Sequence, residues 1–451
     1  MRIVIIGGVA AGMSAASQAK RRMPNAEVIA LERGRYVSYG ACGLPYNIQD
    51  PQRDIQDLVV ISPADFRYKR GIDVRTQHEV LSIDAARRKI LVRDLSAASD
   101  YVETFDRLVI ATGAQAVRPP IEGLDLPGVF LLRELTDGDG IKRFIEDTVP
   151  RHAVIIGAGY IGLEMADALT HRGLTVTILE KAPQVLPGFE PVIAEIVAQE
   201  LENYAVRVQT GVTVQAVRKT DRGLTLQTSN GDIAAELVLV SVGVRPNVAL
   251  AQAAGVALGE SGAIAVDALQ RTNIADVYAA GDCAEALHRV LSKPLYMPLG
   301  TTANKQGKVA GANAAGAAQQ FAGVVGTAAF KVFDLEVART GIGAAEASHY
   351  GFEALSVVSR HASRGNHYPG SVRITTVVFA QRGSGQLLGA QMVGADTVAK
   401  RVDVFATALS ARMSVGDIES LDLSYAPPFA PVYDPVLIAA GVARKALSRQ
   451  R

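Results

Sequence analysis

The sequence is poor in cysteine, because its 451 residues include only Cys42 and Cys283. Two thiols so far apart do not make a disulfide framework, and reduced thiols indicate a cytoplasmic compartment. Long hydrophobic runs are missing too: no stretch of about eighteen apolar residues occurs, so we expect no membrane span. The apolar run that opens the chain is too short for a signal peptide and predicts a buried first strand.

An excess of charge is also absent, since 46 Lys+Arg stand against 45 Asp+Glu and the formal net charge is +1. A chain with this balance gives no reason to expect nucleic acid or an anionic membrane as a partner. The composition does contain 49% hydrophobic and 20% charged residues, enough to bury large cores. The length suggests about three domains.

A first glycine turn follows the predicted N-terminal strand. The pattern runs through a strand over 2–6, a turn with Gly7, Gly8 and Gly12, a helix to about 22 and a strand over 28–31 that ends at Glu32. Glu32 comes 20 residues after Gly12, which is the spacing of an acid that binds a ribose. The turn offers backbone N–H groups and a positive helix end to a pyrophosphate. Val9 departs from the strict fingerprint, so an ordinary tight turn stays the alternative.

A second glycine turn matches the strict fingerprint. It follows a strand over 153–156 and contains Gly157, Gly159 and Gly162, and a further strand over 175–179 leads to Glu180. Glu180 lies 18 residues after Gly162, so this unit is predicted to bind a dinucleotide. An acid at this position favours the free 2′-hydroxyl of NADH over the 2′-phosphate of NADPH, although the adjacent Lys181 weakens the preference.

Cys42 lies in a small-residue turn, SYGACGLPY over 38–46, about ten residues after Glu32. A βαβ fold brings this turn back towards the ligand of the first glycine turn. A thiol acts as a nucleophile only as thiolate, so a working Cys42 needs its pKa lowered, and Gly40 to Gly43 are suited to start a helix that does this. The alternative is a buried cysteine that serves only as a small hydrophobe.

The rest of the chain predicts how the units are joined. A buried strand over 276–280 ends in Gly281 and Asp282, whose carboxylate is suited to accept hydrogen bonds from a sugar-alcohol hydroxyl, while Cys283 is expected only to pack. Beyond residue 326 there is no glycine fingerprint. There the pattern predicts strands over 355–358, 371–379 and 386–393, a helix over 397–411 and an irregular loop over 425–435. The predicted units are 1–112 with 246–325, 113–245, and 326–451.

Two dinucleotide units in one chain indicate hydride chemistry, which needs a donor and an acceptor that face each other. NADH and FAD make such a pair, and a cysteine beside a flavin directs two electrons to a disulfide, polysulfide, peroxide or oxygen. The alternative is a two-cofactor reductase whose cysteine is idle.

The combined motifs resemble the pyridine nucleotide-disulfide oxidoreductase superfamily over nearly the whole chain. The similarity is to the branch with one redox-active cysteine, which contains coenzyme A-disulfide reductases, NADH oxidases and NADH peroxidases, and most of all to the coenzyme A-disulfide reductases. The matching segments are 7–12 (GGVAAG), 38–46, 111–113 (ATG), 157–162 (GAGYIG), 281–282 (GD), 299–307 (LGTTANKQG) and 425–435.

The resemblance implies an α/β fold with two Rossmann-like dinucleotide-binding domains of the glutathione reductase type and a C-terminal α+β dimerisation domain. FAD would bind the first unit and NAD(P)H, with NADH favoured, the second, and two copies would form a homodimer. Tyr160 would gate the nicotinamide over the flavin. The cofactor-binding residues that it implies are Gly7, Gly8, Gly12, Glu32, Arg33, Thr112, Gly113, Gly157, Gly159, Tyr160, Ile161, Gly162, Glu164, Glu180, Gly243, Asp282 and Thr302.

The resemblance also implies how a substrate is handled. Cys42 would attack the disulfide, and Tyr368 and Tyr425 would lie near the substrate sulfur, donated across the dimer. The implied substrate-binding residues are Arg21 and Arg22, at a basic site for the phosphates of coenzyme A, with Ser38 and Tyr433. No metal site is expected. The chain ends at Arg451, so we expect no appended sulfurtransferase domain of the kind that some relatives carry.

The substrate stays open at this point. Ala41 stands where coenzyme A-disulfide reductases usually have asparagine, and Gln49 and Asp50 stand where they have a glycine pair. The leading hypothesis is an NAD(P)H-dependent reductase of coenzyme A disulfide, or of a related persulfide or polysulfide, that works through a mixed disulfide on Cys42. The alternatives are an NADH oxidase that forms a Cys42 sulfenic acid and an electron-transfer reductase for a small iron–sulfur protein in which Cys42 is idle.

Overall fold

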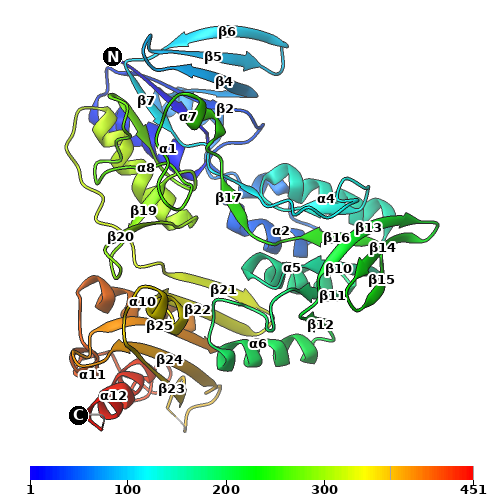
Figure 1. Ribbon diagram of the computed structural model, residues 1–451, viewed down its shortest axis with the longest axis vertical. Helices are drawn as coiled ribbons and strands as arrows, with labels where there is room; N and C mark the ends of the chain where they lie inside the picture. Colours follow the sequence, from blue (N-terminus) through cyan, green and yellow to red (C-terminus); the bar gives the residue numbers. More distant parts are fainter. Residues whose placement is uncertain (366, 450–451) are drawn as a thin grey trace.

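The computed structural model describes residues 1–365 and 367–449, and Figure 1 shows three lobes. The first lobe contains a parallel sheet in the order β18-β7-β1-β2-β3. Ile3, Val4 and Ile5 at its centre are fully buried, as expected for a β-branched strand covered on both faces. Its elements are β1 (Arg2–Ile6), α1 (Ala10–Arg22), β2 (Glu27–Glu32), α3 (Pro63–Arg70), β3 (Asp73–Thr76), β7 (Arg107–Ile110), α7 (Ala249–Ala253), β18 (Val277–Ala279), β19 (Glu285–His288), β20 (Lys293–Tyr296) and α8 (Gly300–Ala314).

The second lobe repeats this plan, with a parallel sheet in the order β12-β11-β10-β16-β9. Its elements are β9 (Val129–Leu131), α4 (Leu135–Thr148), β10 (His152–Ile156), α5 (Tyr160–His171), β11 (Thr175–Glu180), α6 (Pro191–Asn203), β12 (Arg207–Thr210) and β16 (Leu237–Val240). In both lobes a strand, a helix and a parallel strand follow one another, and each glycine turn stands at the carboxyl end of the first strand. This end of a parallel sheet is where ligands bind in such folds.

In each of these two lobes the chain also forms a three-stranded antiparallel sheet, at the same point in the order of the strands along the chain. The first consists of β4 (His78–Asp84), β5 (Lys89–Asp94) and β6 (Ser99–Thr104), and the second of β13 (Val214–Thr220), β14 (Gly223–Thr228) and β15 (Gly231–Ala235). The chain crosses between the lobes twice, through β8 (Ala114–Ala116) and β17 (Val244–Pro246), which pair antiparallel. The crossings lie where the sequence analysis drew its first two domain boundaries.

The cysteine turn belongs to the first lobe by sequence but packs on the second. It forms the 3₁₀ helix η1 (Ala41–Gly43), α2 (Leu44–Gln49) and the 3₁₀ helix η2 (Ile55–Leu58). Leu44, Ile48 and Ile55 are buried in one core with Leu163 and Leu169 of α5. Figure 1 shows α2, drawn in blue, beside α4 and α5. The segment that contains Cys42 therefore packs against α5, the helix that follows the second glycine turn.

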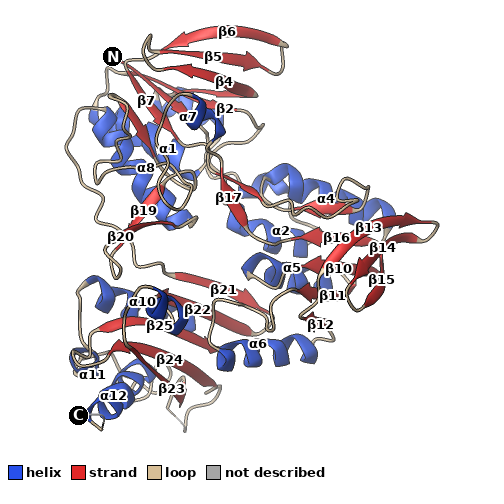
Figure 2. Cartoon of the chain, viewed as in Figure 1, coloured by secondary structure: helices blue, strands red, loops and turns tan. Residues whose placement is uncertain are grey.

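The C-terminal lobe is an antiparallel sheet in the order β21-β22-β25-β24-β23, covered by α10 and α12 (Figure 2). Its elements are β21 (Ala328–Val332), β22 (Leu335–Gly341), α9 (Ala344–His349), β23 (Ala354–Ala362), β24 (Arg373–Gln381), β25 (Leu387–Gly394), α10 (Val398–Ser410), α11 (Val415–Glu419) and α12 (Pro435–Ser448). The predicted strands and helix of this lobe are confirmed, whereas the hairpin of β21 and β22 and the final helix α12 escaped the sequence analysis. Phe333 at the hairpin tip stacks on Tyr204, the residue that follows α6, with ring centroids 4.0 Å apart.

Candidate active site

The first glycine turn is shaped so that α1 begins directly against β1. Gly7 has φ +109°, and a Cβ at Gly12 would overlap the carbonyl oxygen of Gly7. The first turn of α1 contains no acidic side chain, so its N–H groups face the turn without a competing anion. This cradle fits a dinucleotide pyrophosphate. Packing within the protein also requires a glycine at position 8, because a Cβ there would lie 2.7 Å from Val37 Cγ1.

Glu32 and Glu180 occupy equivalent places beside the two turns. Glu32 accepts hydrogen bonds from the N–H groups of Gly8 and Gly34, both at 2.7 Å. Glu180 accepts from Ala158 and Ala182, also at 2.7 Å. Burial raises the pKa of Glu32, with the two N–H groups acting in the opposite direction. Each carboxylate is thus fixed at the end of the second strand, where a ribose hydroxyl is expected.

The second glycine turn repeats the first with the strict spacing. Gly157 has φ +105°, and a Cβ at Gly162 would overlap the carbonyl oxygen of Gly157, so α5 also starts against its strand. A Cβ at Gly159 or Gly243 would meet no described atom within 4 Å, so the open side of the turn lies there. Ile161 is the second residue of α5, beside Tyr160. The turn is therefore suited to a second dinucleotide.

Asp282 closes the first site opposite Glu32. It follows β18, and Arg133 donates to its Oδ2 at 2.6 Å. Nearby, the buried hydroxyl of Tyr296 has no hydrogen-bond partner in the described part of the chain. Burial, and then the charge of the Asp282 carboxylate, raise the pKa of this phenol. Unsatisfied buried polar atoms of this kind call for a ligand or water partner. The hydroxyl and the carboxylate suit the polar chain of a flavin dinucleotide.

The remaining predicted cofactor residues of the first lobe lie around this site. Thr112 and Asn247 exchange two hydrogen bonds, at 2.7 and 3.0 Å, which tie the two crossing strands together beside Gly113. Thr302 is buried at the start of α8, whereas Arg33 is exposed and pairs with Glu134. Arg133, Tyr296 and Asn247 were not among the predicted residues, because no local pattern links them to the glycine turns.

Cys42 is exposed and lies at the start of the helical segment, where Gly40 to Gly43 were predicted to start a helix. The prediction that the surrounding protein lowers the pKa of Cys42 is wrong. Partial withdrawal of the sulfur from water and then the negative charge of Glu164 raise the pKa of Cys42, and Arg133 opposes them. The helix that follows is only six residues long, too short to outweigh the partial desolvation of the sulfur and a nearby carboxylate. The thiolate therefore depends on further positive charge or on a bound group.

Tyr160 is the first residue of α5, and its ring contacts two other aromatic rings. It stacks on Phe330 of β21, with centroids 4.8 Å apart and an interplanar angle of 21°, and meets Phe189 edge-on at 6.0 Å. Burial raises the pKa of its phenol. The predicted gating role stays a prediction. Glu164, one turn further along α5, accepts a hydrogen bond from Tyr46 of α2 at 2.8 Å.

The tyrosines predicted to meet the substrate lie on the C-terminal lobe. Tyr368 is in the β23–β24 loop, and Tyr425 and Tyr433 are in the loop between α11 and α12, and all three are exposed. Within the described chain no hydrogen bond or ring contact joins them to the Cys42 segment, which leaves them available to a second copy. The buried Arg401 anchors their loop, with Nε 2.9 Å from Asp434 Oδ2.

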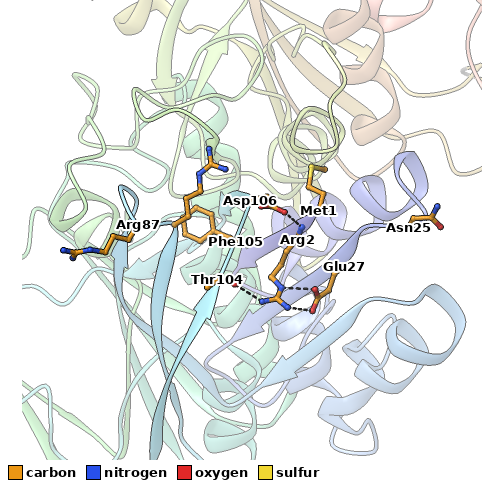
Figure 3. A pocket seen from close by; sticks show the side chains of 9 residues that line it. Met1, Arg2, Asn25, Glu27, Arg87, Thr104, Phe105 and Asp106 are labelled. Atoms are coloured by element: carbon orange, nitrogen blue, oxygen red, sulfur yellow. Dashed lines mark hydrogen bonds and ion pairs between the residues drawn. The ribbon is translucent and has the colours of Figure 1, made fainter.

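Two surface cavities flank the first lobe. The larger, about 530 Å³, lies at the amino ends of β1 and β2, opposite the glycine turns, and Arg2 and Glu27 pair inside it (Figure 3). The smaller, about 340 Å³, lies at the C-terminal end of α1. Its lining residues are Ser17, Lys20, Arg21, Pro24, Arg70 and Ile72. Arg21 lines this cavity together with Arg70, which was not predicted, whereas Arg22 does not line it. The binding of coenzyme A phosphates by Arg21 and Arg22 stays a prediction.

The two glycine turns, their paired acids and one thiol between the lobes are the features of a flavoprotein oxidoreductase. The family models for pyridine nucleotide-disulphide oxidoreductase and for its dimerisation domain match residues 1–317 and 327–435. The chain belongs to the pyridine nucleotide-disulphide oxidoreductase family, whose members use FAD and NAD(P)H. The fold class and the family inferred from the motifs are confirmed.

Curated relatives cover nearly the whole chain. An NADH oxidase of Methanocaldococcus jannaschii is 34% identical over 451 residues, covering 100% of both chains. An NAD(P)H coenzyme A polysulfide/persulfide reductase of Pyrococcus horikoshii is 37% identical over 442 residues, covering 98% of each. A coenzyme A disulfide reductase of Staphylococcus haemolyticus is 28% identical over 429 residues, covering 95% of this chain and 96% of the relative.

A solved structure agrees over the same length. An NAD-dependent persulfide reductase from A. fulgidus superposes with a TM-score of 0.96 at 37% identity, covering 100% of this chain and 84% of the other. Among the described residues, no helix is long and apolar enough to cross a membrane.

Proposed function

We propose that the protein is a homodimeric, cytoplasmic FAD enzyme that uses NADH to reduce coenzyme A disulfide or a related coenzyme A persulfide. The single observation that carries the substrate class is the basic cavity formed by Lys20, Arg21 and Arg70, which offers three cations to phosphates. Relatives named for coenzyme A disulfide and persulfide reduction support the same class. Oxygen and peroxide have no phosphate groups that such a cavity could bind.

The distance between cavity and thiol suits an extended substrate. Ser38 donates its N–H to Gly8 at 2.8 Å, so the Cys42 turn starts at the N-terminal end of α1, while the cavity lies at the other end. Between Ala11 and Arg21 the helix rises about 15 Å, at about 1.5 Å per residue. An extended pantetheine arm spans a distance of this order. We therefore expect the phosphates of the substrate to bind in the cavity and its sulfur to lie at Cys42.

The chemistry requires Cys42 as a nucleophile. Its thiolate attacks one sulfur of the disulfide, a mixed disulfide forms, and the second sulfur leaves as coenzyme A thiolate. The partner subunit's Tyr425 and the partner subunit's Tyr368 stabilise the leaving thiolate by donating hydrogen bonds. FAD in the first glycine cradle and NADH in the second, when bound, would supply the two electrons that break the mixed disulfide, so that the second coenzyme A leaves as a thiol and Cys42 returns to the thiolate.

Substitution of Arg21 or Arg70 by alanine tests the cavity. Each change removes one cation, so we expect KM for coenzyme A disulfide to rise about tenfold while kcat changes little. KM for pantethine, which lacks the phosphates, should stay the same. Arg22→Ala is the matched control, because Arg22 neighbours the cavity without lining it. Equal KM values for wild type and both variants would show that the cavity does not bind the phosphates of the substrate.

Replacement of Glu180 by serine tests the preference for NADH. The fixed carboxylate suits a free 2′-hydroxyl and repels a 2′-phosphate, so its loss should lower the ratio of kcat/KM for NADH to that for NADPH by about tenfold. Steady-state kinetics with both nucleotides measure this ratio. An unchanged ratio would mean that Glu180 does not contact the ribose.

A second candidate function is reduction of oxygen through a Cys42 sulfenic acid. It is favoured by the relative named NADH oxidase, which is 34% identical over both full lengths. Oxygen uptake at saturating NADH, compared with turnover of coenzyme A disulfide, separates the two. Mass spectrometry of protein purified without reductant gives a second readout, since a coenzyme A adduct on Cys42 supports the first function and a bare sulfenic acid the second.

A further inference from the structure

Three aromatic rings meet where the second lobe contacts the C-terminal lobe, and the chemistry above uses only one of them. Tyr160, the first residue of α5, stacks on Phe330 of β21, with ring centroids 4.8 Å apart and an interplanar angle of 21°. Phe189, in the segment between β11 and α6, meets Tyr160 edge-on at 6.0 Å and Phe330 edge-on at 6.4 Å. The ring of Phe330 therefore covers one face of the Tyr160 ring.

Phe330 is fixed by the strand on which it lies. Its side chain is 7% exposed, and β21 lies beside α5 (Figure 1). Further along the same hairpin, the N–H of Phe333 donates to Oδ2 of Asp167 of α5 at 2.8 Å. The hairpin is thus attached to α5 at two points, and the stack of Phe330 on Tyr160 is one of them.

Phe189 is fixed from the C-terminal lobe as well. Arg339 of β22 and Gln391 of β25 both donate to the carbonyl oxygen of Gly188, at 3.2 and 3.3 Å. Phe189 is 6% exposed, and Cζ of Arg339 lies 5.8 Å from the centroid of its ring. Of the three aromatic residues only Tyr160 is partly exposed, so its ring is the one that has room to move.

The Tyr160 ring lies on the side of α5 that a nicotinamide has to cross. Tyr160 directly follows Gly159 of the second glycine turn, where the dinucleotide is expected to bind. Residues four apart share a face of a helix, and Glu164 accepts a hydrogen bond from Tyr46 of α2 at 2.8 Å. This face of α5 is therefore turned towards the segment that contains Cys42, which is the direction in which a hydride has to travel.

We propose that Phe330 is a positioning residue for NADH binding, because it holds the Tyr160 ring in a stack that the ring has to leave before the nicotinamide binds. A ligand that binds only one of two states binds more weakly when the other state is favoured. A stack of two aromatic rings shifts such an equilibrium by about twofold to tenfold. The adenosine half of the dinucleotide does not need the movement. This role of Phe330 rests on the proposed function, in which NADH binds at the second glycine turn.

The test measures equilibrium binding to the FAD-loaded enzyme by isothermal titration calorimetry. The ligands are NAD⁺, which carries the nicotinamide but no hydride to donate, and ADP-ribose, which lacks the nicotinamide. Phe330→Leu keeps an apolar side chain but removes the stacked ring, so the affinity for NAD⁺ should rise about twofold to tenfold while that for ADP-ribose stays the same. Phe189→Leu removes the edge-on contact with Tyr160 and should give a smaller rise. Unchanged or weaker binding of NAD⁺ by these variants would overturn the proposal.

Tyr160→Leu shows whether Phe330 acts through the Tyr160 ring. Once this ring is absent, adding Phe330→Leu should change the affinity for NAD⁺ no further, and an equal gain in both backgrounds would refute the positioning role.

Phe333→Leu is the matched control, because it also removes a stacked ring from the same hairpin, the one that lies on Tyr204. It should bind NAD⁺ like the wild type. A gain as large as that of Phe330→Leu would mean that loosening the contact between the lobes is sufficient, and the proposal would be wrong. Failure of the proposed function would appear separately, as wild-type enzyme that does not turn over coenzyme A disulfide.

Discussion

The variant Cys42→Ser is expected to retain its yellow flavin and to lose disulfide reduction by at least about 1,000-fold, the scale seen when an enzyme loses its nucleophile. A serine hydroxyl at this position lacks the acidity and the sulfur needed to form a mixed disulfide. The flavin should stay because the residues proposed to bind it, Gly7, Gly12, Glu32 and Asp282, make no hydrogen bond to the sulfur in the described chain. Flavin absorbance and NADH consumption with coenzyme A disulfide measure the two effects.

Cys283→Ala provides the control for this experiment. Cys283 is fully buried, with its sulfur 3.4 Å from the carbonyl oxygen of Ala280, and burial raises the pKa of its thiol. Its removal should cost about 1 kcal/mol of stability through a small cavity and leave turnover unchanged. Full activity of Cys42→Ser would refute the mixed-disulfide scheme and support an electron-transfer reductase in which the cysteine is idle.

The variant Gly162→Ala is expected to slow reduction of the flavin by NADH about 100-fold, which is the effect that a displacement of about 1 Å has on a well-oriented reaction. The added Cβ would overlap the Gly157 carbonyl, and it would lie 2.8 Å from Ser241 Oγ. The start of α5 must therefore move away from β10, and Tyr160 and Glu164 move with it. Stopped-flow reduction by NADH measures the loss, and reduction by dithionite should be unaffected because it does not use this site.

Two other glycines make the result specific. Gly140→Ala, in α4 of the same lobe, adds a Cβ that meets no described atom within 4 Å, so it should keep full activity and gain about 0.5–1 kcal/mol of helix stability. Gly159→Ala also has open space, so it should keep its melting temperature but weaken NADH binding if the dinucleotide passes there. Normal reduction by NADH in Gly162→Ala would show that α5 tolerates the methyl group and that the turn is not under the constraint described.

Local patterns were sufficient to predict the scaffold. The buried run before Gly7 and the one before Gly157 each continue into a glycine turn, a helix and an acid, and the structure repeats this order in both lobes. These features depend on neighbours in the chain, since strand propensity, glycine conformation and helix starts are decided within a few residues. The hairpin of β21 and β22 and the helix α12 escaped because their pattern is weak and their stability comes from packing on other elements.

The sequence by itself determined that this protein has two dinucleotide cradles and one thiol near the first, because these follow from residue type and spacing. Only the tertiary structure decided the electrostatics of the site. Glu164 raises the pKa of Cys42, Arg133 holds Asp282, and Arg70 joins Arg21 at one cavity. In each case the partners are remote in sequence, and interactions between charges depend on distance and burial, which the packing of the lobes sets and no local pattern records.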